Sequence, residues 1–96
     1  MDEKTRGFIE KSIDSNLYKI LKSSEKPLKD LTDEILVKSF SELWLGFVLG
    51  TLDMFCGTIL VIDRQKLTRK EQAEIKKMLK RRVPEIAEKI SRKLAK

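Results

Sequence analysis

The residues able to carry out chemistry in this chain are few and isolated. The 96 residues contain no histidine and a single cysteine, Cys56. A catalytic thiolate relies on a base such as histidine, and a zinc site built from one cysteine and carboxylates would lack its usual ligands. Asp53 has no second carboxylate placed for general acid–base chemistry. We therefore expect no enzyme, catalytic residue, metal or cofactor, and expect Cys56 to be a small buried hydrophobic residue.

A dense basic cluster is the main candidate for binding, and its members are Lys76, Lys77, Lys80, Arg81 and Arg82. Phosphates favour such clusters through counterion release, without any recognition of bases. No helix-turn-helix pattern, zinc spacing or set of stacking aromatic residues accompanies the cluster. Basic residues near a helix C-terminus also favour the helix dipole and keep a small protein soluble. The sequence thus predicts a non-enzymatic binding or assembly protein whose basic C-terminal helix contacts an acidic partner, with nucleic acid or an acidic protein as candidates.

The charge is unevenly distributed along the chain. Residues 1–42 hold eight Lys/Arg and nine Asp/Glu, whereas residues 64–96 hold thirteen Lys/Arg and four Asp/Glu. Between them, Leu43–Ile62 carries one charge, that of Asp53. The chain therefore consists of a nearly neutral N-terminal part, an apolar middle and a basic C-terminal part.

The apolar stretch Leu43–Ile62 is either a membrane span or the central element of a small core. Basic residues follow it, as the positive-inside rule requires of a cytoplasmic flank: Arg64, Lys66, Arg69 and Lys70. Against a span stand Asp53 near the middle, three glycines, and a helical period that begins upstream at Leu31. The amphipathic segments on both sides also need an apolar partner. We favour a bundle core and keep a single span with a cytoplasmic basic tail as the alternative.

The N-terminal segment, residues 3–23, has the apolar spacing of an amphipathic helix. We expect this helix to end at Ser23–Pro27, because proline lacks the N–H that a continuing helix needs. A central helix is expected over about 31–55, capped by Asp30 or Thr32. The apolar positions of the first helix are Ile9, Ile13, Leu17, Ile20 and Leu21.

The central helix has two distinct faces at 100° per residue. Aromatic residues with one threonine form the first face: Phe40, Trp44, Phe47, Thr51 and Phe55. The opposite band, which lets another backbone approach closely, is predicted to be a helix–helix interface and contains Gly46, Gly50, Asp53 and Gly57. Residues 58–62 are β-branched and could form a strand or a helix; we prefer helix or an irregular buried segment, because no other strand is evident to pair with.

The C-terminal segment contains the clearest helix start. Thr68-Arg69-Lys70-Glu71 matches the S/T-x-x-E capping box. Pro84 indicates either a kink or a fresh helix start. The apolar stripe of this segment is Ile75, Leu79, Val83, Ile86, Ile90 and Leu94.

We therefore predict an all-α, four- to five-helix protein. Residues 1–96 are expected to be one domain, with an N-terminal amphipathic helix (1–27), an apolar central element (28–62) and a basic C-terminal helical segment (63–96). A homodimer is expected, through the glycine band or the aromatic face with Trp44. One cysteine and a charged N-terminus favour the cytoplasm, and the Lys, Glu, Ile and Leu bias is compatible with a thermophile.

Overall fold

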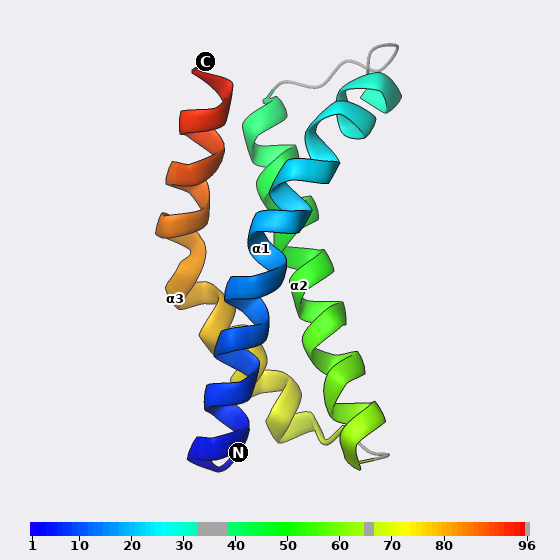
Figure 1. The fold of residues 1–96 in the computed structure, drawn as a ribbon, viewed down its shortest axis with the longest axis vertical. Helices are drawn as coiled ribbons and strands as arrows, with labels where there is room; N and C mark the ends of the chain where they lie inside the picture. Colours follow the sequence, from blue (N-terminus) through cyan, green and yellow to red (C-terminus); the bar gives the residue numbers. More distant parts are fainter. Residues whose placement is uncertain (33–38, 65–66, 96) are drawn as a thin grey trace.

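The computed structural model describes residues 1–32, 39–64 and 67–95, and these form three α-helices. They are α1 (Glu3–Thr32), α2 (Phe40–Arg64) and α3 (Arg69–Leu94). Both α1 and α3 pack against α2, and the three run alternately up, down and up (Figure 1). The all-α prediction is confirmed. The prediction of four or five helices is wrong. Pro27, which was expected to end a helix, and Pro84, where a new helix was one alternative, both lie inside continuous helices.

The first of these prolines, Pro27, lies within α1. The helix continues because side chains beyond or near the proline are held by α2. Ser24 is buried beneath Trp44, and Leu28 packs partly on the core. Proline removes one backbone hydrogen bond of the helix, and these contacts offset that loss. In Figure 1 the C-terminal, cyan part of α1 leans away from α3.

The second proline, Pro84, lies inside α3 and is exposed. The sequence predicted either a kink or a new helix at this position. The structure has one continuous helix that changes direction, which is the first alternative (Figure 1). The start of α3 is as predicted. The Thr68 hydroxyl accepts a bond of 3.1 Å from the Glu71 backbone N–H, and the Glu71 carboxylate accepts one of 3.2 Å from the Thr68 N–H. This reciprocal pair satisfies N–H groups that the first turn leaves without partners.

The predicted bounds of the central helix, 31–55, are wrong at both ends. Leu31 and Thr32 complete α1, and residues 33–38 of the expected helix lie outside the described residues, as does Lys66 of the expected basic flank. The helix begins after Ser39, whose hydroxyl accepts a bond of 3.3 Å from the Glu42 N–H. Ser39 and Glu42 have the same S-x-x-E spacing as the recognised box at Thr68, so the sequence did contain this start signal.

Residues 58–62 are helical and continue α2 to Arg64. The Thr58 hydroxyl donates to the carbonyl of Met54 at 2.8 Å, which satisfies it within the helix. The preferred helical interpretation is thus confirmed. Strand propensity had no effect because no described strand is available to pair with this segment.

The core lies between the three helices, with a seam from each. On α2 every fourth residue from Trp44 to Leu60 points inward. The predicted aromatic face is therefore divided, because Trp44 is buried whereas Phe47 and Phe55 remain 43% and 39% exposed. The α1 and α3 stripes were largely predicted correctly. The buried apolar side chains are Ile9, Ile13, Leu17, Leu21, Trp44, Val48, Leu52, Cys56, Leu60, Ile75, Met78, Leu79, Ile86 and Ile90.

Candidate interaction surfaces

The basic surface lies on the first half of α3 and contains four of the five predicted residues. Lys76, Lys77, Lys80 and Arg81 are exposed, and none forms an ion pair with another described residue. The exposed Arg69 and Lys70 extend this group toward the start of the helix. We call these six residues the basic face of α3.

The carboxylates of this half of α3 have partners within the molecule. The buried Glu71 belongs to the capping box described above. Glu74 contacts the α-amino group of Met1 at 3.1 Å and the Arg6 guanidinium at 3.5 Å. The hydrogen bond from that amino group is the main reason that the pKa of Glu74 lies below its usual 4.5, with Arg6 contributing further. Neither carboxylate extends outward to compensate the lysines of the basic face.

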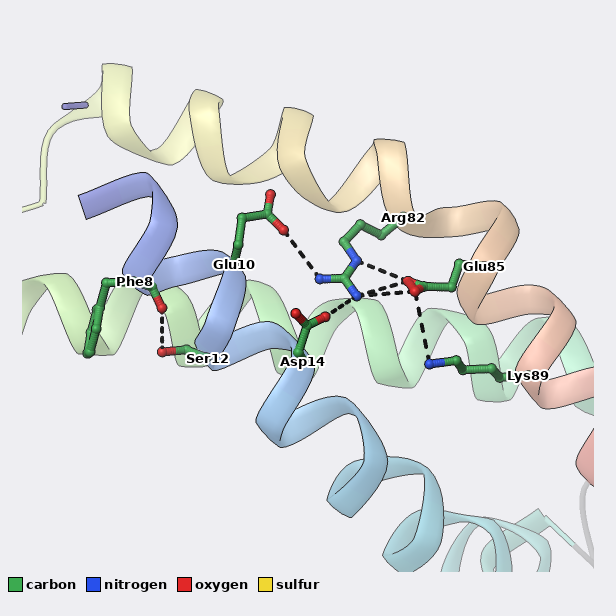
Figure 2. Close-up of polar contacts among 7 residues, drawn as sticks. All are labelled: Phe8, Glu10, Ser12, Asp14, Arg82, Glu85 and Lys89. Carbon is green, nitrogen blue, oxygen red and sulfur yellow. Dashed lines mark hydrogen bonds and ion pairs between the residues drawn. The ribbon is translucent and has the colours of Figure 1, made fainter. Parts of the chain in front are cut away.

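Arg82, the fifth predicted residue, is turned toward α1 instead of outward. Its guanidinium contacts Glu10 at 3.3 Å, Glu85 at 2.9 Å, and Asp14 (Figure 2). Its side chain is 14% exposed. The three carboxylates come from two helices, so Arg82 ties α1 to α3. This arrangement gives Arg82 a structural role, which residue type and local spacing alone did not reveal.

A second surface is the side of α2 that neither α1 nor α3 covers. We call it the outer face of α2. Although α2 is apolar all round, several of its large side chains face outward, with Met54 71% and Ile62 76% exposed. Its large exposed members are Leu43, Phe47, Met54, Phe55, Val61 and Ile62. Large exposed apolar patches mark interaction sites in soluble proteins.

The predicted glycine band is only partly open. A Cβ added at Gly46 or Gly50 would meet nothing within 4 Å, so both positions face open space. Gly57, by contrast, is buried, and a Cβ there would come within 3.2 Å of the Leu67 side chain. Only part of the band is therefore available to a partner, and Gly57 serves a contact within the chain.

Asp53, the fourth member of the predicted interface, is half-buried at the border between α2 and α3. It lines two hollows of about 520 and 260 Å³ that also share Gly50 and Lys76. Lys80 lines the smaller of them. The Asp53 carboxylate forms no ion pair or hydrogen bond with another described residue. Together the two hollows form the α2–α3 groove. Its lining is mainly apolar, with the Asp53 carboxylate and the ammonium groups of Lys76 and Lys80 along its edge.

The groups that could support catalysis are not gathered in the described parts of the chain. No three His, Cys, Asp or Glu residues there lie close enough together to hold a metal ion. Cys56 is fully buried, as predicted, and burial raises the pKa of its thiol to about 11, with the charges of Asp53 and Glu10 adding to the effect. A thiol with this pKa is almost wholly protonated near neutral pH and is a poor nucleophile.

Among the described residues, one helical segment meets the length and composition criteria for crossing a membrane. It is Phe40–Ile62, with a mean hydropathy of 2.0, and 28% of its apolar window is buried. Length and composition alone are weak evidence for a span, since a core helix also meets them.

Comparisons with known proteins add no relative, because no family model, curated protein or solved structure matches this chain.

Proposed function

We propose that this chain is a non-enzymatic binding protein that holds an acidic partner, nucleic acid in particular, on the basic face of α3. The observation that carries the proposal is the concentration of six exposed cations on one half of one helix, where the two carboxylates are engaged in internal contacts. Uncompensated cations along one face attract a polyanion by releasing its condensed counterions.

The shape of this surface favours contact with a phosphate backbone over recognition of bases. The basic face lies on one side of a helix, with Arg69, Lys76 and Lys80 in one row and Lys70, Lys77 and Arg81 in a second row about 100° around the axis. These rows present several cations along the helix to the phosphates of one backbone. It carries no aromatic side chain on which a base could stack. We therefore expect binding that depends on charge and salt with little sequence preference.

The test is fluorescence anisotropy of a labelled DNA duplex titrated with the full chain at two salt concentrations. Four phosphate contacts would lower the affinity on the order of 100-fold between 50 and 200 mM salt. The variant Lys77→Glu/Arg81→Glu should weaken binding about tenfold or more. These two residues are chosen because neither Arg82 nor the α2–α3 groove is disturbed.

The matched control is Lys11→Glu/Lys19→Glu, which makes the same change in net charge on exposed positions of α1. It should retain most of the affinity. Equal losses in the two double variants would indicate attraction by net charge alone and would overturn the assignment to α3. Absence of binding at 50 mM salt would overturn the proposed partner.

A single-span membrane protein remains the second candidate, favoured by the length and low burial of the apolar part of α2. In that state the charged outer sides of α1 and α3 could not stay beside α2 within the hydrocarbon. The bundle would therefore have to open. Retention of the untagged protein in carbonate-washed membranes, with release only by detergent, would support the span, and recovery in the soluble fraction would exclude it.

A further inference from the structure

The outer face of α2 has the spacing of a second helix-packing seam. Exposed positions along it lie on one line, three, four or seven residues apart: Leu43, Phe47, Gly50, Met54 and Val61. The 18 steps from Leu43 to Val61 make five turns at about 3.6 residues per turn, so these positions keep to one line along the helix axis. A second helix laid along this line would contact each of these positions.

The size of the face is close to what a stable interface requires. Its six large side chains expose on the order of 600 Å², from their exposed fractions and whole areas of about 150–250 Å² each. Typical monomers expose largest patches of about 300–600 Å², and stable interfaces bury about 800 Å² per partner. The open glycines and the lining of the α2–α3 groove supply most of the difference. A helix that is apolar all round is normally buried all round, whereas α1 and α3 cover only part of α2.

The face is also complementary to a copy of itself. Gly46 and Gly50 leave open space on the helix surface, while Phe47 and Met54 project beside them. In a pair of α2 helices, the large side chains of each helix would fill the open space beside Gly46 and Gly50 of the other. Interfaces in which one patch meets itself about a twofold axis are the commonest in soluble oligomers.

The charges at the edge of the face fit the same occupant. The α2–α3 groove is edged by Asp53 on α2 and by Lys76 and Lys80 on α3. When two copies meet along α2, the Asp53 carboxylate of one copy can pair with the Lys76 or Lys80 ammonium group of the other. A nucleic acid would find no cation on the seam itself, and a lipid surface would have to accommodate Asp53.

We propose that a second copy of this chain covers the outer face of α2, giving a homodimer in which the two α2 helices pack against each other. The basic face of α3 shares Lys76 and Lys80 with the edge of the groove, whereas Lys77 and Arg81 line neither hollow, so the two proposals are tested by different variants.

The first experiment measures the mass of the full chain by light scattering at micromolar concentration without detergent. The wild type should have twice its monomer mass of 11.2 kDa. Met54→Glu should be monomeric, because two carboxylates would be buried in the seam, weakening association on the order of 100-fold or more. Leu31→Glu is the matched control, since Leu31 is 72% exposed against 71% for Met54 but lies on α1. It should remain dimeric.

The second experiment tests the contact itself by cysteine cross-linking. Gly46→Cys, Gly50→Cys and Met54→Cys each place a thiol on the seam, and the position nearest the twofold axis should form a disulfide-linked dimer on mild oxidation. The side chains introduced at the glycines meet nothing in the monomer, so the fold should be retained. Leu31→Cys and the wild type, with its buried Cys56, should stay unlinked.

Three outcomes would overturn the proposal. A wild-type monomer at micromolar concentration means that no second copy binds the face. A dimer that persists in Met54→Glu and gives no cross-link on the seam means that the copies meet elsewhere. Binding to phosphatidylcholine vesicles that Met54→Glu abolishes, with the soluble wild type monomeric, would assign the face to lipid.

Discussion

At the residue scale, a hydrogen bond inside the core explains why α1 passes through its proline. The Trp44 indole N–H donates to the Ser24 hydroxyl at 2.7 Å, and that hydroxyl donates to the Ile20 carbonyl at 2.5 Å. Both side chains are buried, so neither has water as an alternative partner. The bond lies three residues before Pro27 and holds this turn of α1 against the start of α2.

The variant Ser24→Ala tests this role. It should lower the free energy of unfolding by about 1–3 kcal/mol, because the Trp44 N–H would be left in the core without a partner. Ser23→Ala is the matched control: Ser23 is exposed and its hydroxyl likewise donates to the carbonyl four residues back. Its effect should be within about 0.5 kcal/mol. Urea unfolding followed by Trp44 fluorescence measures both, and equal effects would show that the Trp44 bond contributes little.

At the element scale, Arg82 connects two helices that otherwise meet mainly through α2. Glu10 and Asp14 on α1 and Glu85 on α3 converge on its guanidinium (Figure 2). The acidic side chains are 41–63% exposed, so water screens the attraction, and the contribution is modest compared with that of a buried pair. The network nevertheless fixes how α1 and α3 face each other across the core.

Replacing Arg82 should expose this connection. Arg82→Met keeps much of the apolar stem but leaves three carboxylates close together, and should destabilise the fold by about 1 kcal/mol at low salt. The loss should shrink at high salt, where repulsion between exposed carboxylates is screened. Arg81→Met, at an exposed neighbour with no ion pair to a described residue, should have almost no effect on stability. The free energy of unfolding of both variants is measured with denaturant at two salt concentrations. Equal effects of the two variants would contradict a stabilising role for the Arg82 network.

At the scale of the whole molecule, Cys56 reports whether the bundle stays closed. It lies on the inner seam of α2 with no exposure, and its thiol pKa of about 11 leaves almost no thiolate at pH 8. Reaction with a thiol reagent therefore requires the helices to separate. For a stability of about 5–15 kcal/mol, labelling should be slowed at least a thousandfold relative to the unfolded chain.

The measurement is the rate of labelling by a water-soluble disulfide reagent at pH 8. The control, Cys56→Ala/Ser15→Cys, carries its thiol at an exposed position of α1 and should react at the rate of a small thiol. A wild-type rate near that of the control would show that α2 leaves the bundle readily, as a membrane-spanning state requires.

Much of the fold followed from the local pattern. The α1 stripe, the α3 stripe and the Thr68 capping box depend on residues within a few turns of each other, and their interpretation was confirmed. The passage of α1 through Pro27 depends on Trp44, twenty residues from Ser24, so no local rule could reveal it. The inward turn of Arg82 likewise depends on Glu10 and Asp14, about seventy residues away.

An apolar helix followed by basic charge could be predicted from the residues alone, because composition and period are local properties. The side of α2 that is covered could not be predicted in this way, because it depends on how the other two helices pack. A helix that is apolar on every side gives no preferred direction for packing, and the direction is set by where α1 and α3 place their own apolar stripes. These helices cover the line from Trp44 to Leu60 and leave Phe47, Gly50 and Met54 facing outward.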